Sequence, residues 1–178
     1  MRGPIRANSF GALAGIGTPG NLAGELFKMK TGLDLPVVQY RGVAPVVADL
    51  LGGHVQATFD IGTTSIEYVR AGRLRALAIL SATRSELFPD IPIMADYVPG
   101  VEASLWVGIA APKKTPAAIV EKLNKEINAT LADPRMKARF GDLSFTVLPG
   151  SPAEFGQFIA EDTEKWRKVI RAANIKAE

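Results

Sequence analysis

The amino-acid sequence predicts an α/β chain built around a parallel-rich sheet. Within residues 8–80, three strand-like runs each lead through a glycine-rich or polar loop into apolar residues with helical spacing. Parallel strands require crossover connections of this kind, and the loops that follow them gather at the carboxyl edge of the sheet, where ligands bind in such folds. We therefore expect a ligand-binding edge in this part of the chain.

The first of these loops is the most distinctive. Residues 8–13 form a short apolar run, Ala14-Gly15-Ile16-Gly17-Thr18-Pro19-Gly20-Asn21 follows, and Leu22, Leu26 and Phe27 then mark one face of a helix. A glycine-rich turn that opens a helix exposes backbone N–H groups beside the positive end of the helix dipole, so it can hold a carboxylate or a phosphate. Taken alone, the loop favours an ordinary turn whose glycines only supply positive φ angles.

The same arrangement recurs twice, which favours a binding edge over three unrelated turns. A proline at the first turn and glycines after the last turn delimit the second helix, and the third strand ends in a carboxylate, Asp60. The expected elements are a strand at 35–40, a helix from Pro45 to Gly52-Gly53, a strand at 55–60, a helix at 66–71 and a strand at 74–80.

The second half of the chain is expected to be mainly helical. Strands are predicted at 104–111 and 145–148, and the other segments show helical periodicity with recognisable starts. The predicted helices begin at Thr115-Pro116, with the stripe Ile119, Leu123, Ile127 and Leu131; at Asp133-Pro134, with Met136, Phe140 and Leu143 facing inward; and at the capping box of Ser151 and Glu154, with Phe155, Phe158, Ile159, Trp166, Val169 and Ile170 on one face.

Composition excludes several classes of protein. An apolar fraction of 47% suffices for a core, and no run of eighteen apolar residues suits a membrane span. Cysteine is absent and His54 is the only histidine, so the usual thiolate and zinc sites are not expected. The net charge is +3, but the densest arginines, Arg70 to Arg84, flank a turn and a strand. We therefore expect no nucleic-acid partner.

No pattern in the chain predicts catalysis. The carboxylates near the expected edge do not pair at a spacing that suits general acid–base chemistry, and no serine lies in a nucleophile-elbow pattern. The element Gly15-Ile16-Gly17 lacks the third glycine and the acidic residue of a dinucleotide fingerprint, and a Gly-Lys-Ser/Thr loop is absent. We expect a protein that is not an enzyme, with no catalytic residue, cofactor or metal.

Six short motifs occur in order along the chain. They are Gly17-Thr18-Pro19-Gly20-Asn21-Leu22-Ala23-Gly24-Glu25-Leu26-Phe27, Tyr40-Arg41-Gly42 with Ala44-Pro45, Asp49-Leu50-Leu51-Gly52-Gly53, Phe59-Asp60, Ala71-Gly72-Arg73-Leu74-Arg75-Ala76-Leu77-Ala78 and Pro89-Asp90-Ile91-Pro92. From about Phe10 to the C-terminus, the chain resembles the substrate-binding receptors of tripartite tricarboxylate transporters, the Bug family. The resemblance implies a type 2 periplasmic-binding-protein-like fold, a periplasmic location, and capture of a dicarboxylate, tricarboxylate or acidic amino acid for membrane permease components.

The resemblance also implies a division of the chain. Such receptors are longer than 178 residues, and the part without a counterpart here is the front: a signal peptide and most of the first lobe. Residues 1–9 are expected to be a leader or remnant without a signal peptide, because no apolar region follows Met1 to Arg6. Residues 10–103 correspond to the second, ligand-binding lobe, and residues 104–178 to the crossover strand and C-terminal helices of the first. Hinges are expected near Ser9-Phe10 and Ala103-Ser104.

Ligand-binding residues follow from the same resemblance. Thr18 and Asn21 are expected as donors, Tyr40 as a wall with a hydroxyl, and Arg41 either as a charge partner or as a plain surface arginine. Asp60 is expected to cap the next helix or to orient a ligand amine. The full expected set is Gly17, Thr18, Asn21, Tyr40, Arg41, Gly42, Ala44 and Asp60.

Two alternatives remain open beside carboxylate capture. The chain could be a protein-interaction module derived from the family, or a truncated piece that no longer binds. In either case the apolar faces of the C-terminal helices need cover, because large exposed apolar patches mark partner surfaces or aggregation sites. We expect a homo-oligomer in which these helices pack on a neighbouring copy; the alternative is that they fold back on the chain's own sheet.

Overall fold

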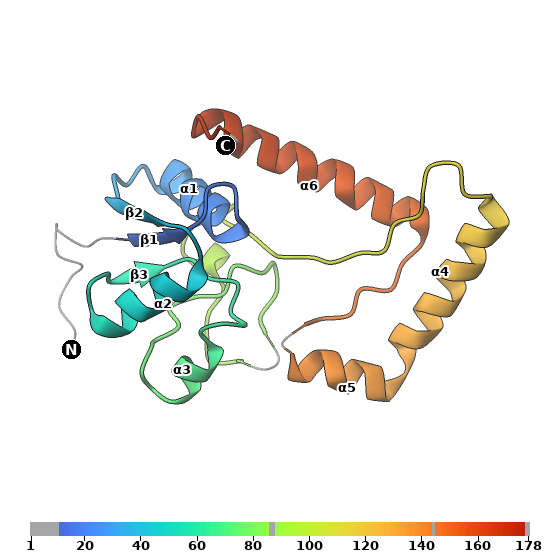
Figure 1. Ribbon diagram of the computed structural model, residues 1–178, viewed down its shortest axis with the longest axis horizontal. Helices are drawn as coiled ribbons and strands as arrows, with labels where there is room; N and C mark the ends of the chain where they lie inside the picture. Colours follow the sequence, from blue (N-terminus) through green and yellow to red (C-terminus); the bar gives the residue numbers. More distant parts are fainter. Residues whose placement is uncertain (1–10, 86–87, 144, 177–178) are drawn as a thin grey trace. The chain divides into compact units, whose positions relative to one another are not determined.

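A computed structural model of the chain describes residues 11–85, 88–143 and 145–176 (Figure 1). It consists of two compact units, Met1–Leu105 with Trp166–Glu178 (unit 1) and Trp106–Lys165 (unit 2). The first boundary lies close to the expected one near residue 103, whereas the last turns of the chain belong to unit 1. The expected segment 1–9 and the hinge at Ser9-Phe10 lie outside the described residues.

Unit 1 is an α/β unit around a parallel sheet, which confirms the predicted fold class. Its three strands lie in the order β2-β1-β3, and both ladders are parallel. Because β1 is central, Ala12, Leu13 and Ala14 are buried. The elements of this unit are β1 (Gly11–Ala14), α1 (Pro19–Thr31), β2 (Val37–Tyr40), α2 (Val43–Gly52), β3 (Ala57–Thr58), α3 (Ile66–Arg70) and a 3-10 turn at Met94–Asp96.

Helices α1 and α2 lie on different sides of the sheet (Figure 1). Leu13 lies against Gly24 of α1, whereas its neighbours Ala12 and Ala14 form a cluster with Val46 of α2 and with Val55. Successive side chains of a strand point to opposite faces, so the two helices cover opposite faces of the sheet. Unit 1 is therefore a three-layer α/β arrangement, in which the loops that follow the strands share one edge.

Two glycines let α1 lie unusually close to the sheet. A Cβ atom on Gly20 would overlap the carbonyl oxygen of Phe59, and a Cβ on Gly24 would lie 2.8 Å from Cδ2 of Leu13. Residues four apart share one helix face, so Gly20 and Gly24 together form a flat contact surface. This contact places the first turn of α1 directly against the backbone at the end of β3.

A second core lies on the other side of α1. Leu26, Val101 and Val169 are its buried residues, and Phe27 and Trp166 pack against it. Val169 and Trp166 belong to α6 (Pro152–Ala172), so the last turns of that helix cover the sheet unit of their own chain. Part of the expected C-terminal apolar face is thus buried within the chain, as in the alternative arrangement given above.

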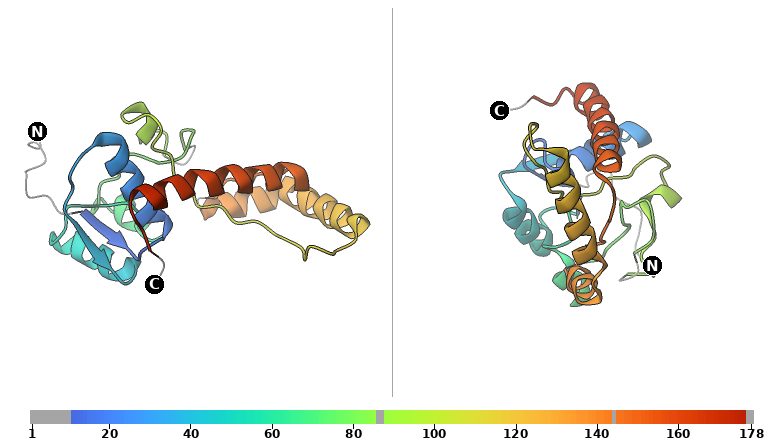
Figure 2. Two further views of the ribbon diagram at one scale, coloured as in Figure 1. Left: turned by 90° about the horizontal axis from the view of Figure 1, so that it is seen from above. Right: turned by 90° about the vertical axis from the view of Figure 1, so that its right-hand side faces the viewer.

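Unit 2 contains α4 (Ala117–Ala132), α5 (Pro134–Asp142) and the first turns of α6 (Figure 2). Helix α4 begins one residue later than predicted, after an N-cap at Pro116. Asp133 caps α5 by accepting a 2.8 Å hydrogen bond from Arg135 N–H. The capping box is confirmed, because Glu154 N–H donates to Ser151 Oγ at 3.2 Å and Ser151 N–H donates to Glu154 Oε2 at 2.7 Å.

Three predicted strands do not form in the described residues. Segment 74–80 makes only one parallel bridge, between Ile79 and Ile93, and segments 104–111 and 145–148 are not paired in a ladder. Leu143, expected to face inward, is exposed. A strand is stable only with a neighbouring strand to satisfy its backbone groups, so local sequence preference alone did not produce these elements.

Replacing Gly20 by alanine should destabilise unit 1, because the new methyl group would meet backbone that cannot rotate away. Overpacking of this kind costs about 1–3 kcal/mol, which outweighs the better helix propensity of alanine. Gly156→Ala on α6 is the matched control: no atom outside the helix lies within 4 Å of its Cβ position, so a gain of about 0.5–1 kcal/mol is expected. Urea unfolding followed by circular dichroism measures both; equal effects of the two changes would contradict the close contact.

The capping box makes the start of α6 sensitive to acid. Hydrogen bonds from the backbone N–H and hydroxyl of Ser151 hold the pKa of Glu154 below its ordinary value of 4.5. A lowered pKa in the folded state means that stabilisation is full above the ordinary pKa and is lost as the pH falls through the lowered one. The difference in unfolding free energy between the chain and Glu154→Gln should therefore shrink between pH 6 and about pH 3. Glu121→Gln, on α4 and outside the box, should show no such trend.

Candidate functional site

Three loops meet at the carboxyl edge of the parallel sheet. They follow β1, β2 and β3 and lead into α1, α2 and α3, and the strand order places the β1–α1 loop in the middle. Gly15 N–H donates to Tyr40 C=O at 2.7 Å, which joins the first loop to the end of β2. The contact of Gly20 with Phe59 joins the same loop to the end of β3. The sequence-predicted edge is therefore continuous.

The β1–α1 loop is held by its own polar side chains. Asn21, only 2% exposed, accepts a 3.0 Å hydrogen bond from Gly17 N–H. The Thr18 hydroxyl donates to the carbonyls of Ala14 and Gly15 and accepts from Asn21 N–H at 3.3 Å. Thr18 and Asn21 thus determine the shape of the loop, whereas the sequence pattern predicts ligand donors at both positions.

The β1–α1 loop offers backbone N–H groups to a ligand. Gly15 and Gly17 have φ angles of 66° and 75°, which L-residues with side chains rarely adopt. The structure records no hydrogen bond from Ile16 N–H or Gly20 N–H to another described residue. Gly20 lies in the first turn of α1, a helix of 13 residues, where the dipole favours negative charge. These two donors suit a carboxylate at the loop.

Tyr40 supports the neighbouring helix. Its hydroxyl donates a 2.6 Å hydrogen bond to Asp49 Oδ2 on α2. That hydrogen bond, with desolvation and the negative charge of Asp49, raises the pKa of the Tyr40 phenol above its ordinary value of 10. The expected wall residue therefore lies at the edge with its hydroxyl already engaged.

The β2–α2 loop is open to solvent. Arg41 and Ala44 are exposed, and the described residues include no ion-pair partner for Arg41. Gly42 occupies the N-cap of α2 in an extended conformation, and no atom lies within 4 Å of its Cβ position. Arg41 is the cation that directly follows β2, and the small residues after it leave space around the loop.

Asp60 is engaged within the β3–α3 loop. Its Oδ2 accepts from Gly62 N–H at 3.2 Å and from the Ser65 hydroxyl. In addition, Thr58 Oγ1 donates to Ala12 C=O at 2.8 Å, which fastens the short β3 to β1. Asp60 thus shapes the entrance to α3, and its negative charge lies at the same edge.

Sequence reasoning missed three contributors to this edge. Asp49 is the partner of Tyr40, Ser65 is a partner of Asp60, and the Phe59 carbonyl sets the position of Gly20. Asp49 and Phe59 lie inside the motifs that resemble the receptor family. No periodicity in the sequence predicts the hydrogen bond between Tyr40 and Asp49, which are nine residues apart. Only the fold brings these groups together.

A small cavity in unit 1 lies between α1 and the sheet. It measures about 40 Å³ and is lined mainly by apolar groups of the strand starts and of α1, among them Gly11, Val37, Ala57 and the Lys28 side chain. Ligand pockets for small molecules measure roughly 300–1,000 Å³, so this cavity is close to the size of one water molecule. It is a packing defect between α1 and the sheet.

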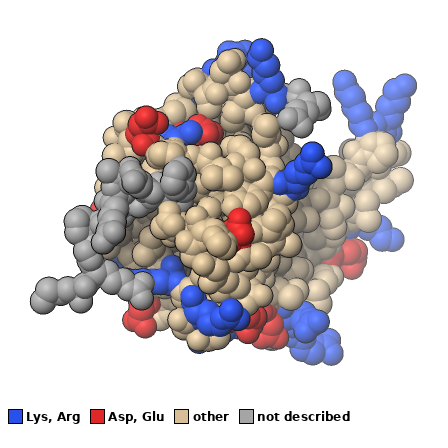
Figure 3. Space-filling view, turned by 60° about the vertical axis from the view of Figure 1, so that its left-hand side comes forward, with Lys and Arg blue, Asp and Glu red and all other residues tan. Residues whose placement is uncertain are grey.

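The described residues bear on three other kinds of site: a metal site, a membrane-spanning helix and a patch of one charge. They contain no group of three or more histidine or acidic side chains that could hold a metal ion. Of the helices that the structure describes, none has both the length and the apolar composition needed to cross a membrane. Basic and acidic side chains are interspersed over the face drawn in Figure 3.

Comparison with known proteins identifies relatives of the whole chain. The model of the tripartite tricarboxylate transporter family receptor matches residues 6–175. Protein BugT of Bordetella pertussis is 37% identical over 166 residues, which cover 93% of this chain and 51% of BugT. The chain therefore spans about half the length of the curated relatives it matches.

Solved structures agree with this relationship. The chain is similar to R. palustris Rpa4515 with adipate, with a TM-score of 0.79 and 32% identity over 94% of this chain and 56% of the other. It is also similar to MatC from Rhodopseudomonas palustris with bound malate, with a TM-score of 0.69 and 27% identity over 92% and 57%. A further solved relative is described as a periplasmic binding protein. The chain belongs to the tripartite tricarboxylate transporter receptor family, a family of solute-binding proteins and not of enzymes.

Proposed function

We propose that this chain carries the carboxylate-binding loops of a solute receptor and binds a small organic carboxylate without changing it. The observation that carries the proposal is the β1–α1 loop, in which two backbone N–H groups at a helix start lack a partner among the described residues. Adipate and malate, bound to two similar proteins, are both dicarboxylates. A helix N-terminus with oriented N–H groups is a general anion site.

Some of the surrounding residues hold the loop in shape, and others place charge beside it. Asn21 and Thr18 hold the loop in place before a ligand arrives, so binding requires little reordering. Arg41 supplies a positive charge from the neighbouring loop, and Tyr40 supplies a fixed apolar wall. Asp60 would favour a ligand that carries an amine, such as an acidic amino acid, by charge attraction.

The same proposal includes lobe closure over the ligand and delivery of the ligand to a transporter. A full receptor would close two lobes over the ligand by a hinge near residues 103–104, and would deliver it to membrane permease components in the periplasm. Family membership supports these roles, but the chain spans only about half of its relatives. Because one wall buries less of a ligand than two, we expect this chain alone to bind at about 1 mM or more weakly.

The competing proposals are an interaction module and a piece that no longer binds. Exposed apolar side chains on the C-terminal helices favour the first, and would also support a homo-oligomer formed through α4 and α6. Ligand titration and light scattering separate the three, because binding and association are measured independently.

Adipate should shift the amide resonances of Ile16, Gly20 and Arg41 in a nuclear magnetic resonance titration, and malate, citrate and glutamate should be compared with it. Adipamide is the matched neutral control and should leave these resonances unchanged, because the oriented N–H groups favour a charged acceptor. Ligand recovered afterwards should be unaltered. Saturable binding of a sugar without binding of any carboxylate would refute the proposal.

Replacing Arg41 by glutamine should weaken carboxylate binding about two- to fivefold, the effect of one exposed charge pair. The loss should diminish at high salt, since screening shortens the range of the attraction. Arg75→Gln removes another exposed arginine of the same unit, outside the three loops, and is the matched control. If both variants weaken binding equally, Arg41 is a plain surface residue and acts only through net charge.

A further inference from the structure

The function proposed above leaves one sequence motif unexplained, Asp49-Leu50-Leu51-Gly52-Gly53 at the end of α2. Its first residue, Asp49, lies near the carboxyl end of the helix, where the helix dipole disfavours a negative charge. Among the described residues, no lysine or arginine forms an ion pair with this aspartate. The stability of α2 by itself therefore does not explain an aspartate at this position.

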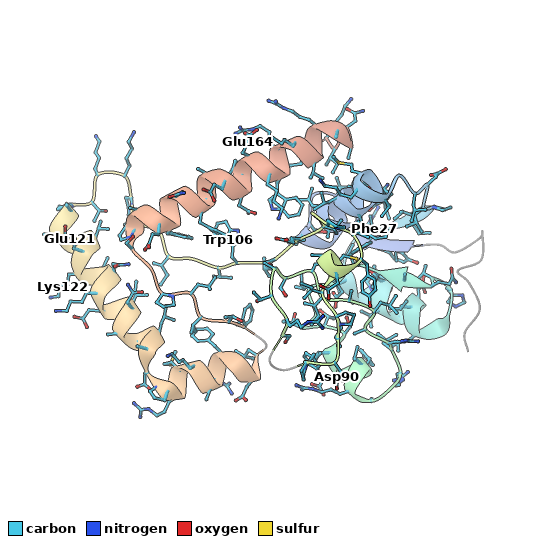
Figure 4. The ribbon with its side chains drawn as sticks, turned by 180° about the vertical axis from the view of Figure 1, so that it is seen from behind. Phe27, Asp90, Trp106, Glu121, Lys122 and Glu164 are labelled. Atoms are coloured by element: carbon cyan, nitrogen blue, oxygen red, sulfur yellow. The ribbon has the colours of Figure 1, made fainter. Side chains whose placement is uncertain are left out.

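Asp49 connects α2 with the end of β2 and with the segment that leads into β3. Its Oδ2 accepts a 2.6 Å hydrogen bond from the Tyr40 hydroxyl, and Tyr40 is the last residue of β2. Its backbone C=O accepts from His54 N–H at 2.9 Å and from Val55 N–H at 3.4 Å. The Tyr40 side chain packs against the same core cluster that contains the buried Val55. Figure 4 shows α2 and the strands with their side chains. Asp49 thus fixes the Tyr40 hydroxyl relative to this side of the sheet.

Tyr40 in turn lies at the junction of two loops of the candidate site. Its C=O accepts the 2.7 Å hydrogen bond from Gly15 N–H, which joins the β2–α2 loop to the β1–α1 loop. Ile16 directly follows Gly15, and Arg41 directly follows Tyr40. Two of the groups proposed to hold a carboxylate, the Ile16 N–H and the Arg41 cation, therefore follow the two residues that this bond joins. A movement of Tyr40 would change how these two groups are placed relative to each other.

We propose that Asp49 is a positioning residue of the carboxylate site, which holds Tyr40 by its hydroxyl and thereby fixes the junction between the two loops. Without this bond the Tyr40 side chain keeps only its apolar packing, which is not directional. A charged acceptor makes the hydrogen bond stronger than one between neutral groups. The effect of Asp49 on binding rests on the proposed function, whereas its effect on the loop junction can be measured in the free chain.

Adipate titration of the full chain and its variants, followed by nuclear magnetic resonance, tests the effect on binding. Asp49→Ala should weaken adipate binding about three- to tenfold, because the loops must be reordered when the ligand binds. The expected direction is informative, since loss of a negative charge by itself would favour an anion. Asp49→Asn removes the same charge but keeps an oxygen that can accept from the Tyr40 hydroxyl, so its affinity should stay within about twofold of the unchanged chain.

Two further variants complete this test. Tyr40→Phe should weaken binding as much as Asp49→Ala, and the double variant should bind no more weakly than either single variant, because both changes remove the same bond. Asp34→Ala removes an exposed aspartate of unit 1 outside the three loops, so it is the matched control and should not weaken binding. Equal affinities of Asp49→Ala and Asp49→Asn would overturn the proposal.

Hydrogen exchange in the free chain tests the loop junction without a ligand. The Gly15 amide should exchange about fivefold or more faster in Asp49→Ala than in Asp49→Asn, since its acceptor is the Tyr40 carbonyl. The Gly11 amide donates to Pro36 C=O at 2.9 Å at the other end of the same strand pair, so it is the internal control and should change little. Equal acceleration of both amides would show that Asp49 only stabilises unit 1, and would overturn the proposal.

The two measurements separate this role from the proposed function. If the unchanged chain binds no carboxylate but the Gly15 amide responds to Asp49→Ala, the proposed function fails and Asp49 still fixes the junction. If adipate binds with the same affinity to the chain and to Asp49→Ala, the proposed function stands and the positioning role is overturned.

Discussion

The close approach of α1 to the sheet is the constraint on which the candidate site depends. Gly20 sits against the Phe59 carbonyl and Gly24 against Leu13, so the start of α1 is fixed by backbone and by a buried side chain. That position decides where the β1–α1 loop lies and which N–H groups face outward. A larger residue at either glycine would move the helix start, and with it the donors that carry the proposed binding.

Most polar side chains at the edge serve the protein's own structure. Asn21 and Thr18 form hydrogen bonds with backbone groups of the β1–α1 loop. The Tyr40 hydroxyl donates to Asp49, and the Asp60 carboxylate accepts from Gly62 N–H in its own loop. A buried polar group without a partner is costly, which explains why the buried Asn21 side chain is hydrogen-bonded within its own loop. The edge therefore presents main-chain groups of the β1–α1 loop, and the partly exposed side chains of Thr18, Tyr40 and Asp60 are already hydrogen-bonded within the protein.

Sequence reasoning predicted what depends on local chemistry. The helix starts at Asp133 and Ser151 follow from capping, and the parallel arrangement of the first three strands follows from the repeated loops. It failed where a residue's role depends on a partner far along the chain. The strand predicted at 104–111 lacks a neighbour, and the position of Gly20 depends on the carbonyl of Phe59, which lies on another strand-to-helix loop.

A site made of peptide groups separates recognition from residue identity. The N–H of residue 16 is present with any side chain except that of proline, and the Ile16 side chain itself is half exposed. In the proposed site, substitutions there would change the length or bulk of ligand that fits while keeping the backbone contact with its charged end. In the proposed site, the class of ligand would therefore depend on the backbone and the size of ligand on the residue at position 16.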